Sequence, residues 1–294
     1  MCLSLNSNPH EKGDAFTYEL STVPAALFDA SSQCMRKADK AVLGRYLCEL
    51  CKDASNVPLD NTIYVLDGGA LVHKMPWPKC GTFKDVFCQY ATHVLKHYGK
   101  ATIVFDGYSI CSTKDVEHKR RNKQSSLTFA FYDNTPIVSN KTAFLCNSEN
   151  KQRSVNALGT CLKNYGSTVI HSTGDSDTLI VKTALCLATE KHVTVVADDT
   201  DILLLLLYRD QGNMALQSST ASENVIDIKL MQDAIGKRVC GNLLFVHVFT
   251  ICDTTSALYG KGKKVYFNIL ENVMLCQLVQ PCMVVTKMPP KTVS

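Results

Sequence analysis

Short apolar runs rich in β-branched residues alternate with segments of helical spacing through the middle of this chain. The apolar runs cover residues 62–66, 101–105, 167–171 and 192–197, and the helical spacing covers residues 83–98, 154–165 and 177–190. Strands and helices in this order form parallel pairs through right-handed crossovers. The unbroken run VTVVA suits a strand that is buried on both faces. We therefore expect an α/β fold of three layers, with a mainly parallel central sheet between helices.

The remaining segments predict further elements and an order of domains. Residues 202–208 fit either a helix or a buried strand, because a short apolar run does not separate the two. Two strands of a hairpin and three helices are predicted after it, at residues 214–217, 225–228, 230–235, 243–251 and 265–278. Residues 15–51 also have helical spacing. We expect a helical N-terminal extension and linker over residues 1–60, a main domain over residues 61–278 and a flexible tail over residues 279–294.

Composition excludes several classes of protein. Of the 294 residues, 46% are hydrophobic, which is too many for a disordered chain. The longest apolar run is far shorter than the roughly 20 residues that span a bilayer, and the opening residues do not resemble a secretory signal. The 14 cysteines are scattered, so we expect reduced thiols in an intracellular protein without a membrane partner. A net charge of +4 permits nucleic-acid binding without requiring it.

Aspartates follow the predicted strands at the ends where parallel sheets form their sites. They are Asp67, Asp106, Asp198, Asp199 and Asp201 after three strands, Asp175 and Asp177 after a fourth, and Asp253 after an apolar helix. Carboxylates that converge at one edge repel, and their pKa values rise unless a cation neutralises them. Mg²⁺ and Mn²⁺ prefer such oxygen ligands. Two ions about 3.5–4 Å apart can activate a water and stabilise the leaving oxygen of a phosphodiester displacement.

Each aspartate alone also has a structural explanation. An aspartate after a strand commonly caps a helix or forms a turn, and the Asp-Gly pairs at Asp67 and Asp106 are common in turns. Helix capping alone does not explain why acids follow each of several successive strands at the same end of the sheet. Their joint placement therefore favours a metal site.

The order of these motifs resembles the flap-endonuclease branch of the PIN-like 5′-nuclease superfamily. The matching segments are YVLDGG, IVFDG, GDSDTLI, ADDTDIL and ICDTTSALYGKGKK, and the resemblance covers residues 62–266. DGGALVHKMPWP, VFDGYSICSTKDVEHKRR and CDTTSALYGKGKK are also similar to a group of multicopy animal proteins with mobile-element features. The resemblance implies a nuclease that cleaves structured or flapped nucleic acid with two Mg²⁺ or Mn²⁺ ions. It implies that one ion lies closest to Asp67, Asp106, Asp177 and Asp199, and that the second is served by Asp201 and Asp253, with Asp175 assisting.

The sequence departs from that family in ways that keep other functions open. Asp175 and Asp177 stand where the family usually has glutamate, or glutamate and aspartate, and Ile251 and Cys252 precede Asp253 where a glycine is expected. Few residues follow the expected helix-turn-helix, so downstream DNA contacts are expected to be missing. The alternative is a catalytically inactive PIN-like protein of mobile-element origin that binds nucleic acid or acts as a scaffold. A phosphatase-like site around residues 175–178 ranks lower, because it leaves the other aspartates unexplained.

Two basic segments accompany the acids. The first contains Lys114, Lys119, Arg120, Arg121 and Lys123, and the resemblance implies that it begins a basic arch over the active site. A solvated helix face or a nuclear import signal explains it equally well. The second contains Lys261, Lys263 and Lys264, which predict either a phosphate cradle or a plain basic loop. We expect a nuclear monomer that binds nucleic acid, DNA ahead of RNA, without reading bases.

Overall fold

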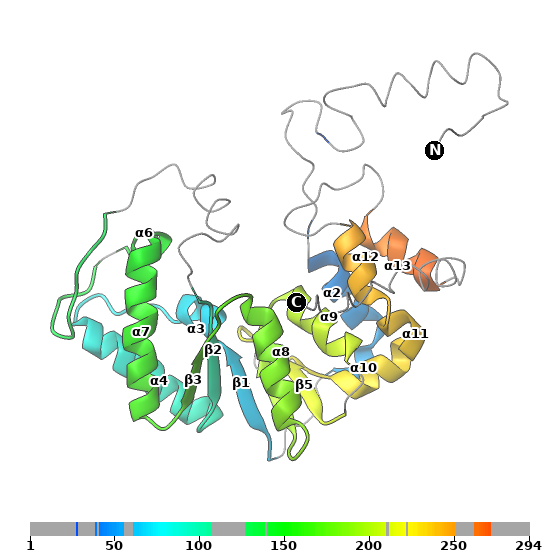
Figure 1. Cartoon of the computed structure of the whole chain (residues 1–294), viewed down its shortest axis with the longest axis horizontal. Helices are drawn as coiled ribbons and strands as arrows, with labels where there is room; N and C mark the ends of the chain where they lie inside the picture. Colours follow the sequence, from blue (N-terminus) through cyan, green and yellow to red (C-terminus); the bar gives the residue numbers. More distant parts are fainter. Residues whose placement is uncertain are drawn as a thin grey trace, which may run out of the picture. The chain divides into compact units, whose positions relative to one another are not determined.

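The computed structural model describes residues 28, 39, 41–55, 61–107, 127–138, 140–209, 212–221, 223–250 and 262–271 (Figure 1). The chain divides into two compact units. One consists of Cys51–Ala234, and the other combines Met1–Leu50 with Ile235–Ser294.

A six-stranded sheet with the strand order β3-β2-β1-β4-β5-β6 forms the centre of the unit Cys51–Ala234. The strands are β1 (Ile63–Asp67), β2 (Thr102–Phe105), β3 (Thr168–His171), β4 (Val193–Val196), β5 (Met214–Gln217) and β6 (Val225–Asp227). The first five strands pair in parallel with one another, and β6 is antiparallel to β5. The α/β class, the mainly parallel sheet and the final hairpin are therefore confirmed.

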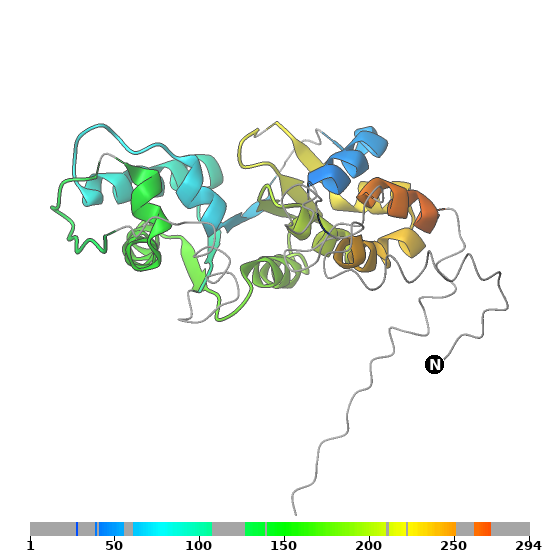
Figure 2. The same cartoon turned by 90° about the horizontal axis from the view of Figure 1, so that it is seen from above.

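Helices cover both faces of this sheet (Figures 1 and 2). The helices between residues 52 and 235 are η1 (Lys52–Ala54), α3 (Gly68–Lys74), α4 (Phe83–Tyr98), α6 (Lys141–Cys146), α7 (Ser148–Asn164), α8 (Ser176–Leu187), α9 (Thr200–Tyr208) and α10 (Ile228–Ile235). α4 packs against α7, and α7 packs on β3, whereas α8 packs on β1, β2 and β4. The ambiguous residues 202–208 belong to the helix α9, because Asp199 caps a helix that begins at Thr200.

Side-chain alternation along the strands divides the core between the two faces of the sheet. Leu66, Ile103 and Phe105 are buried in one cluster with side chains of α3, α4, α6 and α7. Leu66 and Ile103 are register partners on β1 and β2, so the cluster is continuous across the strands. Their chain neighbours Val65 and Val104 therefore point to the opposite face, over which α8 packs.

The ends of the helices follow local sequence signals. Thr82 and Asp85 form a reciprocal capping box at the start of α4, and Gly99 with φ 63° follows its last residue. The side chain of Asn147 accepts hydrogen bonds from two N–H groups in the first turn of α7. The predicted helix at residues 83–98 is confirmed at both ends for this reason.

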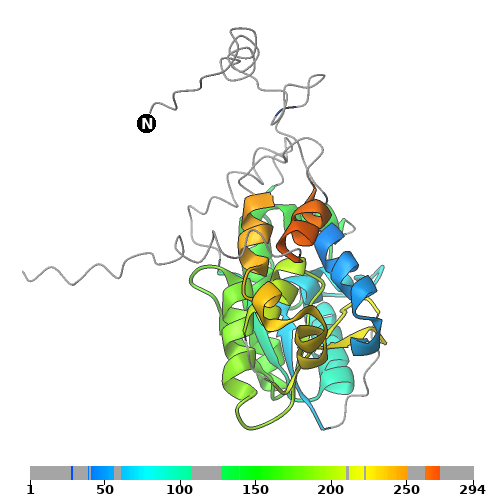
Figure 3. The same ribbon diagram turned by 90° about the vertical axis from the view of Figure 1, so that its right-hand side faces the viewer.

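The second unit contains α2 (Ala41–Leu50), α11 (Lys237–Cys240), α12 (Leu243–Thr250) and α13 (Lys263–Glu271). α13 packs against both α2 and α12 (Figure 3). The ring of Tyr46 meets Phe267 edge-on at a centroid distance of 5.5 Å, and Leu43 and Leu47 are fully buried. The helical character of residues 41–50 is thus confirmed.

Several predictions about the ends of the chain fall outside the described residues. They are the domain limits at residues 60 and 278, the tail over residues 279–294 and most of the helical segment at residues 15–40. Among the helices that the structure describes, none is both long enough and apolar enough to cross a membrane.

Candidate metal centre

The strands β2, β1 and β4 are neighbours in the sheet, and an aspartate stands at or shortly after the end of each. Asp67 is the last residue of β1, Asp106 follows β2, and Asp199 comes three residues after β4. β3 leads through a short turn to Asp175 and Asp177 at the start of α8. We call Asp67, Asp106, Asp175, Asp177, Asp199 and Asp201 the carboxylate edge. Its position agrees with the rule that open parallel sheets bind ligands at the carboxyl ends of their strands.

Three members of the carboxylate edge form a compact triad. One carboxylate oxygen from each of Asp177, Asp199 and Asp201 lies within 4.8 Å of the other two. Asp199 is exposed, whereas Asp177 and Asp201 are half-buried. Like charges this close repel, and a bound cation would relieve the repulsion. Because all the donors are carboxylate oxygens, the set fits a hard divalent cation.

Asp67, at the end of β1, is close enough to Asp106 and Asp199 for their charges to affect its pKa. Burial raises the pKa of Asp67 above its ordinary value, and the charges of Asp106 and Asp199 raise it further. The N–H groups of Ala70 and Gly69 act in the opposite direction and lower this pKa. Asp67 is therefore within electrostatic reach of both neighbouring strand ends. A cation held among these carboxylates would relieve the penalty on the charged form.

Three of the predicted metal ligands also cap helices. Asp67 Oδ1 accepts from the N–H of Gly69 at 2.8 Å, and Asp199 Oδ1 accepts from the N–H of Asp201 at 3.0 Å. Asp175 Oδ2 accepts from both the N–H and the hydroxyl of Thr178, at 3.1 and 3.0 Å. The structural explanation is thus correct for these three residues. It does not exclude ion binding, because a carboxylate has two oxygens and about four acceptor sites.

Gly68 and Gly107, which follow Asp67 and Asp106, lie so close to other residues that a side chain would not fit. A Cβ atom at Gly68 would lie 2.3 Å from the ring of Phe105, and one at Gly107 would lie 1.5 Å from the carbonyl oxygen of Ser172. The N–H of Ser172 donates to the carbonyl of Phe105 at 2.9 Å, which ties the ends of β2 and β3 together. The glycines after Asp67 and Asp106 are therefore required by packing.

Asp198 does not take part in the acidic triad, although it precedes Asp199 directly. Its Oδ1 accepts from the hydroxyl of Ser218 at 2.7 Å and from the N–H of Ser219 at 2.9 Å. The hydroxyl of Ser219 donates to its other oxygen. We call Asp198, Ser218 and Ser219 the serine turn. Asp198 fixes the connection that follows β5 and has a structural role.

Ser172 supports the acidic residues of α8, a role that the sequence did not predict. Its hydroxyl accepts from the N–H of Gly174 at 3.0 Å and donates to the carbonyl of Asp175 at 3.2 Å. This pair of bonds shapes the turn that delivers Asp175 and Asp177. The available signal was Ser-Thr-Gly after a strand, a composition typical of such turns.

Most of the other predicted site residues lie outside the part of the chain that the structure describes. Asp253, Lys261 and the basic segment with Lys114, Lys119, Arg120, Arg121 and Lys123 lie outside the described residues. Lys264 is exposed, with its Nζ 4.4 Å from the ring centroid of Tyr46.

The prediction that Lys263 lies in a phosphate cradle or a basic loop is wrong, because its side chain is buried against a helix. It is only 2% exposed, and its Nζ lies 2.9 Å from Nδ1 of His247. Lys263 is the first residue of α13, which packs against α12, the helix that carries His247. Its burial between these helices does not fit a contact with phosphate.

Comparison with known proteins adds information about the fold. No protein-family model matches the sequence, and no curated protein matches it either. A bacteriophage T5 protein co-crystallised with metal ions is 14% identical, with a TM-score of 0.50 over 78% of this chain and 80% of that chain. The T5 flap endonuclease in a pseudo-enzyme-product complex with DNA and metal ions is 13% identical, with a TM-score of 0.45 over 78% and 80% of the two chains. The catalytic core of Rad2 in complex with DNA substrate is 11% identical, with a TM-score of 0.45 over 76% and 64%.

Identities this low show a fold and leave the activity to be established. The likeness at a TM-score of 0.50 agrees with the mainly parallel sheet, and the acidic triad lies at the edge where such sheets bind ligands. The chain therefore shares the fold of that T5 protein, as the resemblance to PIN-like 5′-nucleases predicted.

Proposed function

We propose that this protein is a divalent-metal-dependent nuclease that hydrolyses phosphodiester bonds in structured or flapped nucleic acid. The observation that carries the proposal is the triad of Asp177, Asp199 and Asp201, whose carboxylate oxygens lie within 4.8 Å of one another. The PIN-like 5′-nuclease fold supports it, because the triad stands where this kind of sheet presents its sites.

The proposed cofactor is a pair of Mg²⁺ or Mn²⁺ ions, which carboxylate oxygens suit. The triad and Asp67 would hold them, and Asp106 and Asp175 would complete the ligand set in this unit. Asp253, which the family resemblance assigns to the second ion, stays a prediction. Bound ions would polarise the scissile phosphate, lower the pKa of the attacking water and stabilise the leaving oxygen.

The chain's own contribution is to hold the carboxylates in place before an ion binds. Asp67 and Asp199 are fixed by hydrogen bonds from N–H groups at the starts of α3 and α9, and Asp175 is fixed at the start of α8. A carboxylate has about four acceptor sites, so a cap bond does not prevent it from binding a cation. Ligands that are already oriented bind with a smaller loss of conformational entropy.

We propose DNA as the substrate ahead of RNA, in the nucleus. The basic segment at residues 114–123 would contact phosphates of the cleaved strand, as the family resemblance implies. Lys263 is left out of this proposal, because its side chain is buried.

A catalytically inactive PIN-like scaffold is the second candidate. The observation that favours it is that Asp67, Asp175 and Asp199 all cap helices. Acids with this role stabilise their helices even where no ion binds. The two candidates agree on the fold and differ in whether the carboxylate edge binds ions and cleaves.

The decisive experiment incubates the purified protein with 5′-flap and hairpin DNA in Mg²⁺, in Mn²⁺ and in EDTA. Asp201→Asn is the test variant. Asp233→Asn is the matched control, because that carboxylate is exposed and pairs with Lys229 at 2.9 Å on α10. The nuclease requires cleavage that needs the cation, disappears in Asp201→Asn and persists in Asp233→Asn. DNA binding without cleavage by the unmodified protein would establish the scaffold instead.

A further inference from the structure

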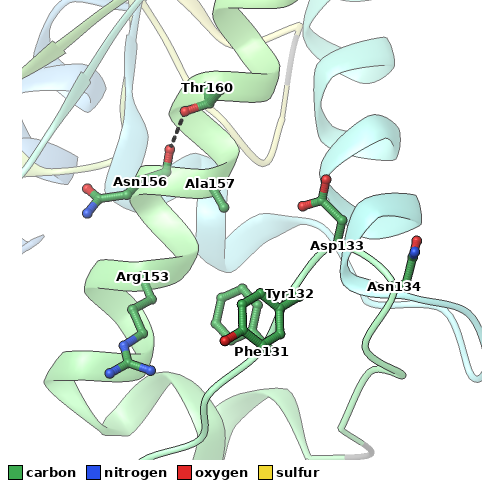
Figure 4. Close-up of a pocket in the computed structure, with 8 residues that line it drawn as sticks. All are labelled: Phe131, Tyr132, Asp133, Asn134, Arg153, Asn156, Ala157 and Thr160. Atoms are coloured by element: carbon green, nitrogen blue, oxygen red, sulfur yellow. Dashed lines mark hydrogen bonds between the residues drawn. The ribbon is translucent and has the colours of Figure 1, made fainter.

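A hollow of about 640 Å³ lies between residues 131–134 and α7, in the same unit as the carboxylate edge (Figure 4). Its volume is within the range of about 300–1,000 Å³ that is usual for small-molecule sites. One wall is the turn with Tyr132 and Asp133, and the other is the outer face of α7 with Arg153 and Asn156. Neither wall belongs to the proposed metal centre.

The turn that forms the first wall is firmly held. The ring of Phe131 stacks on the buried Phe83, with a centroid distance of 4.1 Å and an interplanar angle of 18°. The N–H groups of Phe83 and Lys84 donate to the carbonyls of Thr135 and Asp133, at 3.1 and 3.0 Å. The next side chain, Tyr132, is 81% exposed. A supported backbone thus displays a large aromatic ring to solvent.

The second wall is a single stripe of α7. Arg153, Asn156, Ala157 and Thr160 have the spacing i, i+3, i+4 and i+7, which places them on one helix face. The small Ala157 leaves space between its longer neighbours. The hydroxyl of Thr160 donates to the carbonyl of Asn156 at 3.1 Å within the helix. Arg153 is exposed, so its guanidinium is accessible to a ligand in the hollow.

The chemistry of the two walls matches the parts of a nucleotide. An exposed phenol ring is a platform on which any base can stack, and a guanidinium recognises phosphate. The amides of Asn134 and Asn156 can pair with the edges of a base. Arg153 and Asp133 are the only charged side chains that line the hollow among the described residues, and their charges balance. This balance does not fit a surface for the backbone of a duplex, which requires several cations.

We propose that the hollow binds one unpaired nucleotide of a single-stranded nucleic acid, with the base stacked on Tyr132 and the phosphate on Arg153. The proposal rests on the proposed function, because a single-stranded arm of the substrate would supply the nucleotide.

The first test measures binding of a fluorescent single-stranded oligothymidylate, and of a duplex of equal length, by anisotropy in EDTA. Tyr132→Ala should weaken single-strand binding about fivefold or more, and Tyr132→Phe should not, because the phenyl ring can still stack. Tyr208→Ala is the control, since Tyr208 is 40% exposed in the same unit and lies against Arg209 instead of the hollow.

The second test measures the same binding over a range of salt concentrations. Removal of one phosphate contact with a single strand lowers the slope of log affinity against log salt by about 0.7. We expect this change for Arg153→Gln and no change for the control Arg209→Gln. A slope that is equal in both variants would overturn the assignment of Arg153.

The outcomes separate this proposal from the nuclease. Binding in EDTA does not depend on catalysis, so a loss specific to Tyr132→Ala supports the hollow even if no cleavage occurs. The proposal is overturned if the unmodified protein does not bind the single strand, if Tyr132→Ala binds it as tightly as the control, or if duplex binding falls equally. If any of these results is found together with cation-dependent cleavage, the proposed nuclease function stands and the proposed nucleotide site in the hollow is wrong.

Discussion

The carboxylate edge and the serine turn begin at adjacent residues and have opposite electrostatic environments. In the serine turn, Asp198 receives hydrogen bonds from two hydroxyls and one N–H group. At the carboxylate edge, Asp199 lies within 4.8 Å of two other carboxylates and raises the pKa of a third, Asp67. The same residue type therefore meets hydrogen-bond donors in one place and other carboxylates in the other.

This difference shows what distinguishes a structural acid from a candidate ligand. The protein satisfies the charge of Asp198 with its own donors, so no other group is required there. The charges of Asp177, Asp199 and Asp201 lie close together, and a cation is the usual way to compensate such a group. Asp198 and Asp199 are adjacent in the sequence, yet one has a structural role and the other is a candidate metal ligand.

The largest expected difference between the two regions is in catalysis. Asp199→Asn keeps a side-chain oxygen for capping α9 and removes one charge from the triad, so we expect cleavage to fall by about 100-fold or more. Asp198→Asn should stay within about twofold of the unmodified protein. Initial rates on a 5′-flap substrate in Mn²⁺ provide the measurement, and equal losses in the two variants would break the comparison.

A divalent cation should stabilise the fold through the carboxylate edge alone. At a concentration about 100 times its Kd, a ligand that binds only the native state adds about 2.7 kcal/mol to the free energy of unfolding. We expect Mn²⁺ to raise the thermal midpoint of the unmodified protein and of Asp198→Asn, and to have little effect on Asp199→Asn. Stabilisation that persists in Asp199→Asn would place the ion elsewhere.

Without a cation, we expect Asp198→Ala to lower the free energy of unfolding more than Asp199→Ala does. Asp198→Ala leaves three donors of Ser218 and Ser219 without their acceptor, which costs about 1–3 kcal/mol. Asp199→Ala loses a helix cap, worth about 1 kcal/mol, but it also removes a repelled charge. Urea denaturation in EDTA checks the order, and a larger loss for Asp199→Ala would show that capping outweighs repulsion at the edge.

The smallest expected effect is a change in pH dependence at Asp67. Its pKa is raised in the folded protein, so its contribution to stability is complete below the ordinary value of 3.8 and is lost as the pH rises through the folded pKa. Asp67→Asn keeps the acceptor for Gly69 and does not titrate. In EDTA, we expect the stability of Asp67→Asn relative to the unmodified protein to increase from pH 4 towards neutrality. A relative stability that falls over this range would contradict the sign of the shift.

Much of the fold was predictable because its strands are short, apolar and rich in β-branched residues. Each strand ends near an acid or a turn residue, so residues 62–66, 101–105 and 192–197 were located to within one residue at each end. The convergence of the acids followed from parallel pairing alone. Which acids share one small volume did not follow, because α8 must first pack across β1, β2 and β4 to bring Asp177 to Asp199.

Other features depend on tertiary contacts that leave no local pattern. α3 begins with Gly68 and Gly69, residues that disfavour helices, and it was not predicted. Gly68 is required by the ring of Phe105, which is distant in sequence. The burial of Lys263 was also missed, because a lysine beside glycines predicts an exposed loop. The roles of Asp253 and of residues 114–123 stay predictions.

The starts of α8 and α9 have a consequence for the electric field at the site. An α-helix carries a partial positive charge at its N-terminus, and Asp175, Asp177, Asp199 and Asp201 all lie at or within the first turn of one of these two helices. The peptide dipoles therefore offset part of the repulsion among the acids in the absence of any ion. The backbone itself makes a concentration of anions tolerable at this edge.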